Sequence, residues 1–171
     1  ALYVPPVCSD AGLALGAAWV HAAAEGDRPG SLPHAFWGPE FSTTDIRMVL
    51  DRAGAEYHLV DDPVTAAAEL IAQDRIVGWF QGRMEFGPRA LGNRSILASP
   101  RRAEVKDEIN ARIKFREEFR PLAPSVRHAE GKGFFDGYAD SPFMTQCFTA
   151  TDETAREAPA VVHADGTSRL Q

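Results

Sequence analysis

Residues 82–127 form an arginine-rich stretch broken by glycines and prolines, and this stretch limits the possible folds more than any other part of the chain. From Arg83 to Arg127 there are nine Arg and two Lys against six acidic residues, a net charge of +5, although the whole chain of 171 residues carries −6. The glycines and prolines exclude a single solvated helix. We therefore expect several short elements that gather positive charge in one place, as an anionic ligand needs.

Composition and charge exclude several other classes of protein. The acidic pI of about 5.3 disfavours bulk binding of duplex nucleic acid, which needs a basic surface. No apolar run approaches a membrane span, and the start does not resemble a secretory signal. Cys8 and Cys147 are far apart and lack metal-ligand spacing, so we expect two reduced thiols in a cytoplasmic protein. The chain begins on Ala1 and ends on Gln171 just after a motif-like segment, so we expect it to be part of something longer.

Local sequence patterns predict alternating helices and strands. Helices are expected where a capping residue precedes an apolar or alanine-rich run, and strands where β-branched and aromatic residues cluster. The predicted helices cover 11–24, 42–53, 61–73, 103–113 and 128–135, and the predicted strands cover 56–60, 75–81, 94–98, 122–126, 143–150 and 160–163. The Gly- and Pro-rich residues 27–39 are expected to form a linker or a long loop. This alternation predicts the α/β or α+β class with one main sheet.

A glycine-rich turn is expected directly after the predicted strand that ends at Gln81. Pro88 can begin a short helix there, and such a turn exposes backbone N–H groups that are suited to an anion. Three arginines surround it: Arg83, Arg89 and Arg94. The common nucleotide-loop patterns do not match. The alternative is that these arginines pair with Glu85 and with carbonyl groups, and so only hold the loop in place.

A second cluster of positive charge follows at Lys114 and Arg116, with Arg120 shortly after. In an extended segment, side chains two residues apart share a face, and the prolines after Arg120 favour extension. These residues could therefore form a Lys-x-Arg clamp for an anion. The alternative is exposed salt bridges to Glu117 and Glu118, which would contribute little to stability.

Two further places could bind a ligand. Asp10 could simply cap the first helix, or it could be a ligand whose partners lie elsewhere in the sequence. His163, Asp165 and Arg169 surround a polar turn, which could be a plain turn or a substrate loop. The other histidines lack metal-binding spacing, and no Ser/His/Asp or Cys/His arrangement suggests a protein nucleophile.

Five segments of the sequence together resemble one family. They read Asp-Ala-Gly-Leu-Ala-Leu-Gly from residue 10, Gly-Arg-Met-Glu-Phe-Gly-Pro-Arg-Ala-Leu-Gly-Asn-Arg-Ser from 82, Lys-Phe-Arg-Glu-Glu-Phe-Arg-Pro-Leu-Ala-Pro-Ser from 114, Ser-Pro-Phe-Met from 141 and His-Ala-Asp-Gly-Thr-Ser-Arg from 163. In this order, across nearly the whole chain, they resemble the bacterial O-carbamoyltransferases of antibiotic tailoring and nodulation-factor synthesis.

The resemblance implies a two-domain enzyme. Residues 1–30 would be the end of a larger N-terminal transferase domain with an ATPase-like (actin-like) fold. Residues 31–171 would be most of a YrdC-like domain, a twisted mixed sheet flanked by helices, because chains of this family normally continue past Gln171. The YrdC-like domain would use ATP, with Mg²⁺, and carbamoyl phosphate to form carbamoyl adenylate. The other domain, with a metal such as iron, would pass the carbamoyl group to a hydroxyl of a small natural product.

The family's functional residues can be carried over only where motifs match. Lys114, Arg116 and Arg120 resemble the YrdC-type anion clamp, and Arg89 and Arg169 resemble further phosphate contacts. Ser125 is a candidate donor in the same pocket. Asp10 resembles a metal or nucleotide ligand of the transferase domain, whose histidine partners would lie upstream. Gathered cations suit this chemistry because ATP and carbamoyl phosphate repel each other.

Three other interpretations remain open at this point. YrdC-like domains can present a basic concave surface to RNA, although the net charge of −6 argues against nucleic acid as a partner here. A threonylcarbamoyl-adenylate synthase would use bicarbonate and threonine in place of carbamoyl phosphate. A silent lobe that only docks on a partner domain would bind neither nucleotide nor carbamoyl phosphate.

Overall fold

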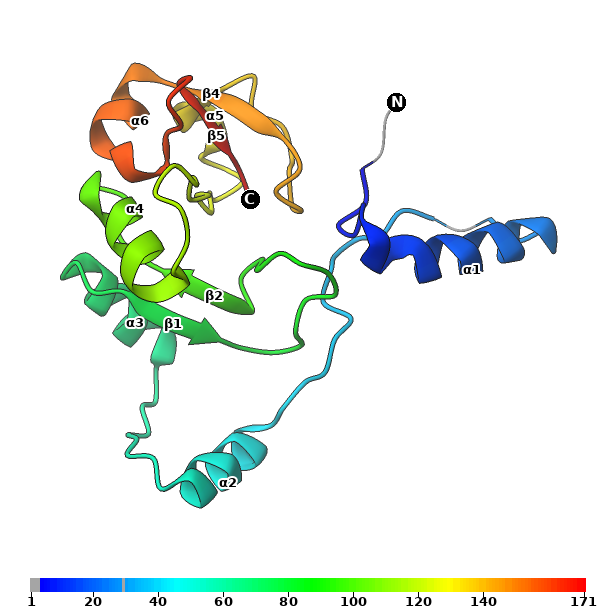
Figure 1. The fold of residues 1–171 in the computed structure, drawn as a ribbon, viewed down its shortest axis with the longest axis horizontal. Coiled ribbons are helices and arrows are strands. Elements are labelled where there is room, and N and C mark those ends of the chain that lie inside the picture. Colours follow the sequence, from blue (N-terminus) through cyan, green and yellow to red (C-terminus); the bar gives the residue numbers. More distant parts are fainter. Residues whose placement is uncertain (1–3, 29) are drawn as a thin grey trace.

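The computed structural model describes residues 4–28 and 30–171. Ala1 to Tyr3, and Pro29 of the predicted linker, lie outside the described residues. A short 3-10 helix, η1 (Asp10–Gly12), leads into α1 (Leu13–Ala24), which lies apart from the rest of the fold in Figure 1. No residue of α1 is buried, although the helix is apolar almost all round. None of the helices in the described ranges is both long and apolar enough to cross a bilayer.

Two well-capped helices follow the linker. Helix α2 (Thr43–Ala53) begins with a capping box in which Ser42 and Asp45 bond reciprocally, and it ends at Gly54 in the left-handed conformation. Helix α3 (Pro63–Ala72) begins at Asp62, whose side chain accepts a hydrogen bond from the backbone N–H of Thr65. Both helices were predicted from these caps.

The arginine-rich stretch begins in the loop of a hairpin. Strand β1 (Val77–Phe80) pairs antiparallel with β2 (Arg94–Leu97), and a 13-residue loop, 81–93, connects them. Helix α4 (Glu104–Ile109) follows and continues into the π-helix η2 (Asn110–Lys114). Val105 and Ile109 of α4 pack against Ala160, Ile76, Ala98 and Leu122. These residues form most of the apolar face predicted for this helix, but Ile113, which was predicted to extend that face, is 39% exposed.

The second sheet contains three antiparallel strands in the order β3-β4-β5. These are β3 (Phe135–Asp136), β4 (Cys147–Ala150) and β5 (Thr167–Arg169), with the helices α5 (Gly131–Phe134), α6 (Asp152–Glu157) and η3 (Pro159–Val161) around them. One face of the sheet packs through Phe135, Phe148 and Leu170. Figure 1 shows this sheet on the far side of α4 from the hairpin.

The mixed α/β composition is confirmed, but the described strands form two small antiparallel sheets in place of one main sheet. The predicted strand 56–60 is irregular and carries exposed Leu59 and Val60. The predicted strand 122–126 is extended and exchanges backbone hydrogen bonds with Gln171. Pro121 and Pro124 lack the N–H groups that a longer ladder would need. Residues 159–161 form η3, because Pro159 favours a helical turn at its start.

The linker is attached to the loop of the hairpin. The N–H of Gly38 donates to the carbonyl of Met84 (2.9 Å), the N–H of Met84 donates to the carbonyl of Pro39 (2.9 Å), and the N–H of Phe86 donates to the carbonyl of Ala35 (2.6 Å). Ala35 also packs with Leu91 and Phe143 in a small apolar cluster. Residues 35–39 of the predicted linker are therefore held against residues 84–86, and they help to position the loop.

A candidate anion-binding site

The loop 81–93 is organised by one buried carboxylate. Glu85 is 4% exposed, and its Oε1 accepts hydrogen bonds from the backbone N–H groups of Leu91 (2.7 Å) and Asn93 (2.8 Å). The second oxygen, Oε2, accepts from Nε of Arg94 (2.8 Å). The short helix expected after Pro88 does not form in this described loop, whose residues are bends and irregular backbone.

Two arginines of the turn are used to hold it together. Arg94 pairs with Glu85 and also donates from Nη2 to the carbonyl of Glu85 (3.0 Å). Arg83 donates from Nε to the carbonyl of Gly38 (3.1 Å) and so joins the loop to the linker. These contacts are the loop-holding alternative considered from the sequence. A contact of Arg83 or Arg94 with a substrate stays a prediction.

The Lys-x-Arg segment leaves the end of η2 in a sharp turn. Phe115 adopts the left-handed conformation with φ of 46°, and the N–H of Arg116 donates to the carbonyl of Asn110 (3.1 Å). This turn, and not an extended backbone throughout, places Lys114 and Arg116 on the wall of the same cavity. The convergence expected of this pair is therefore present, although the local conformation that produces it differs.

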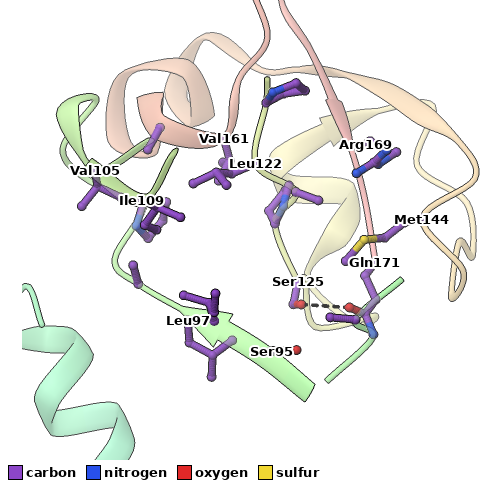
Figure 2. A pocket seen from close by; sticks show the side chains of 18 of the residues that line it. Ser95, Leu97, Val105, Ile109, Leu122, Ser125, Met144, Val161, Arg169 and Gln171 are labelled. Carbon is purple, nitrogen blue, oxygen red and sulfur yellow. Dashed lines mark hydrogen bonds between the residues drawn. The ribbon is translucent and has the colours of Figure 1, made fainter. Parts of the chain in front are cut away.

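The cavity lies between β2, α4, the segment 121–125 and β5, and has a volume of about 440 Å³. Figure 2 shows Val105, Ile109, Leu122 and Val161 along one side of it, and Ser125, Met144, Arg169 and Gln171 along the other. Ser125 donates from Oγ to Oε1 of Gln171 (3.3 Å). Five of the predicted site residues line this one cavity: Arg89, Lys114, Arg116, Ser125 and Arg169.

The cations of this cavity are not neutralised by acids. Among the described residues, no ion pair or hydrogen bond involves the side chains of Arg89, Lys114 or Arg169. The Nε atom of Arg169 is buried without a partner. An unpartnered buried donor is costly, and an acceptor from a ligand would remove that cost.

Burial and neighbouring positive charge lower the pKa of three cationic side chains of the cavity. Desolvation, and then the charge of Arg89, lower the pKa of Arg169, while Cys147 opposes the shift and Arg116 adds to it. Desolvation and then Arg116 lower the pKa of Lys114. Desolvation and then Arg120 lower the pKa of Arg116, while Glu117 opposes. Because these cations disfavour one another, a bound anion would stabilise all of them.

Besides Arg83, Arg94 and Asp10, three predicted residues lie outside the lining of the cavity. Arg120 donates to Glu117 (2.9 Å) on the surface, which is the salt-bridge alternative considered from the sequence. His163 and Asp165 both bond to the hydroxyl of Thr167, at 3.2 and 2.8 Å, and shape the turn before β5. The Nε2 atom of His163 is buried without a partner. Substrate contacts for these three residues stay predictions.

Asp10 lies in η1 at an exposed position, and its side chain caps no helix. Within residues 4–28 and 30–171, no group of three or more His, Cys, Asp or Glu side chains could hold a metal ion. The described residues alone therefore do not form a metal centre. A metal at Asp10 would need ligands from outside them, and it stays a prediction.

A family comparison covers the part of the chain that forms the cavity. The sequence model described as "Carbamoyltransferase C-terminus" matches residues 68–171, which include the whole arginine-rich stretch and every residue assigned to the cavity. The chain belongs to this carbamoyltransferase family.

Relatives match along almost the entire chain. "Nodulation protein NolO" of Bradyrhizobium diazoefficiens is 42% identical over 99% of this chain and 32% of its own length. "Nodulation protein U" of Rhizobium fredii is 35% identical over 99% of this chain and 28% of its own length. An uncharacterized protein of Methanocaldococcus jannaschii is 38% identical over 99% of this chain and 29% of its own length. The chain therefore spans about a third of the length of the curated relatives that it matches.

Two residues that shape this cavity were not predicted in that role. Glu85 was considered only as a partner of arginines, and its acceptance of two backbone N–H groups depends on how the loop closes. Asn110 is 0% exposed and bonds to Arg116. Its position next to the apolar helix face, where a polar residue of low helix propensity is unusual, could have indicated a specific role.

Proposed function

We propose that this chain is the carbamoyl-activating part of an ATP-dependent O-carbamoyltransferase. The observation that carries the proposal is the gathering of Arg89, Lys114 and Arg169, none of them paired with an acid among the described residues, on the wall of one 440 Å³ cavity. A cavity of this size can hold phosphorylated ligands, and the family of the chain points to carbamoyl transfer.

The proposed reaction joins carbamoyl phosphate, ATP and water to give carbamoyl adenylate, pyrophosphate and inorganic phosphate. Both substrates are anionic, so the cations offset their repulsion and hold them near each other. Arg169 and Lys114 would also stabilise the charge that develops on departing pyrophosphate. Ser125 would donate a hydrogen bond from its hydroxyl. Water would cleave carbamoyl phosphate to carbamate and inorganic phosphate, and a carbamate oxygen would then attack the α-phosphorus of ATP and displace pyrophosphate. Because water and carbamate are the attacking groups, the reaction requires no protein nucleophile.

Other parts of the activity are assigned to the rest of the full-length protein. Mg²⁺ would accompany ATP as its usual counterion. The acceptor would be a hydroxyl of a small natural product. Residues 1–30 would belong to a transferase domain with an ATPase-like fold, in which Asp10 could contribute to a metal site, with iron as the candidate.

The test is Lys114→Ala in the full-length protein, measured as pyrophosphate release that depends on carbamoyl phosphate. Loss of one charge-assisted contact in the transition state is worth about 2–3 kcal/mol, so we expect kcat/KM to fall by about 30-fold or more. Arg127→Ala is the matched control, because Arg127 pairs with Glu130 on the surface and does not line the cavity. This control should keep its activity.

Equal turnover of Lys114→Ala and the wild type would remove the basis of the proposal. Replacing carbamoyl phosphate by bicarbonate and threonine separates the proposed reaction from threonylcarbamoyl-adenylate synthesis. Mass spectrometry of products formed with a panel of hydroxylated acceptors would then identify the group that is carbamoylated.

A further inference from the structure

Asn110 has the largest fully buried polar side chain among the described residues, and it lies beside the cavity. It is the first residue of η2, is 0% exposed, and does not itself line the cavity. Its Nδ2 donates to the carbonyls of Arg120 (2.9 Å) and Glu118 (3.4 Å), and its Oδ1 accepts from Nε of Arg116 (2.7 Å). A buried amide with all of these partners is highly constrained.

The same residue also fixes the backbone of the segment. Its carbonyl accepts hydrogen bonds from the N–H groups of Phe115 and Arg116, which close the turn at the end of η2. Asn110 therefore contacts the segment 115–120 near both of its ends. An exposed loop of this length would otherwise sample many conformations, and each would place Arg116 differently.

Arg116 is held only by neutral acceptors. Besides Oδ1 of Asn110, its Nη2 donates to the carbonyl of Pro121 (3.3 Å), and no ion pair of Arg116 occurs in the described parts of the chain. Arg94 is the contrasting case in the same molecule, because the carboxylate of Glu85 both orients and neutralises it. An amide can orient a guanidinium group and leave its full charge available to a ligand.

We propose that Asn110 is a positioning residue, which aims Arg116 at the anion in the cavity through a neutral hydrogen bond. This inference deepens the proposed function and rests on it for the identity of the anion. The role requires an amide at position 110, and a carboxylate of the same shape would weaken anion binding in the cavity. Asn110 contributes to binding only through Arg116.

The first test is Asn110→Asp in the full-length protein, with inorganic pyrophosphate as the probe and calorimetry as the measurement. The new carboxylate would neutralise Arg116 and lose both donors to the carbonyls, so we expect the affinity to fall by about tenfold or more. Ala111→Asp is the matched control, since it adds the same charge at the next, exposed position of η2. Equal losses in the two variants would overturn the proposal.

A double-mutant cycle separates positioning from a general structural effect. On an Arg116→Gln background, Asn110→Asp should cost little further affinity, because the residue through which it acts is gone. If Asn110→Asp does not fold, Arg116→Lys decides the question. Lysine keeps the charge but lacks the planar fork, so it cannot bond to Asn110 and Pro121 while facing the cavity, and we again expect about a tenfold loss. Undiminished affinity in Arg116→Lys would contradict the proposal.

The probe keeps this inference distinct from the proposed function. A wild type that binds pyrophosphate but forms no carbamoyl adenylate would contradict the proposed reaction, and the effect of Asn110→Asp on binding could still support the positioning role. A wild type that is active, together with an Asn110→Asp variant of unchanged affinity and kcat/KM, would contradict the positioning role alone.

Discussion

The arginines of this protein differ mainly in what holds their guanidinium groups. Arg94 is neutralised by buried Glu85, Arg116 is held by a neutral amide, and Arg169 has a buried Nε without a partner. The first arrangement stabilises a loop, and the other two leave positive charge at the cavity. Among these three arginines, the chemical type of the partner therefore decides whether positive charge remains at the cavity.

Glu85→Gln tests the structural role at this scale. Glutamine can keep one acceptor for the backbone N–H groups of Leu91 and Asn93, but it loses the charge that pairs with Arg94. We expect the free energy of unfolding at neutral pH to fall by roughly 2–3 kcal/mol, a value discounted because the Arg94 side chain is 33% exposed. Denaturant unfolding of both proteins measures it. A difference below about 0.5 kcal/mol would show that the carboxylate is dispensable.

The pH dependence of this contribution has a definite sign. Burial raises the pKa of Glu85, but hydrogen bonds from Arg94, Leu91 and Asn93 outweigh it and lower the pKa from 4.5 to about 2. The unfolded state therefore binds more protons between these values, and the contribution is complete above pH 4.5 and disappears as the pH falls to about 2. Unfolding experiments at pH 7 and pH 3 should show a smaller difference between wild type and Glu85→Gln at pH 3.

At the scale of elements, caps and turns could be predicted from the sequence, and the pairing between distant segments could not. The capping box at Ser42 and the Asp62 cap indicated the starts of α2 and α3 from local residues alone. Helix α6 was missed, although Thr151 accepts a hydrogen bond from the N–H of Thr154 as an N-cap residue does. The pairing of residues 35–39 with 83–86 is nonlocal, so no local pattern could indicate it.

Gly38→Ala tests that pairing. A Cβ atom at Gly38 would lie 2.8 Å from the carbonyl oxygen of Met84, which is backbone and cannot move away cheaply. We expect a destabilisation of about 1–3 kcal/mol, measured as a lower Tm, because one of the segments must shift. Gly30→Ala is the matched control, since a Cβ there meets no atom within 4 Å. An unchanged Tm for Gly38→Ala would mean that the linker is not held against the loop.

At the scale of the whole molecule, α1 packs against little of the described chain. Leu13 is 68% exposed, Val20 is 73% exposed, and none of the 12 residues of the helix is buried. A helix that is apolar all round is normally covered, and the relatives of this chain are about three times as long. This agrees with the proposal that residues 1–30 belong to another domain of the full-length protein.

Hydrogen exchange on the chain alone would test this weak attachment. Isolated helices of about 12 residues are marginal in water, so the amides of α1 should exchange much faster than those of β4 and β5, whose sheet packs on a buried core. In the full-length protein the same amides should become protected. Equal protection of α1 and β4 in the chain alone would contradict the expected exposure.

The amino-acid sequence by itself determined the starts of α2 and α3, the α/β class and the identity of the charged residues that could meet an anion, because caps, periodicity and charge are local properties. Only the tertiary structure decided that Arg89, Lys114, Arg116 and Arg169 share a cavity while Arg83 and Arg94 hold a loop. The physical reason is that a side chain's role depends on its partners. Glu85, Asn110 and the carbonyl of Gly38 reach these arginines through the folding of the chain, from positions 6 to 45 residues away.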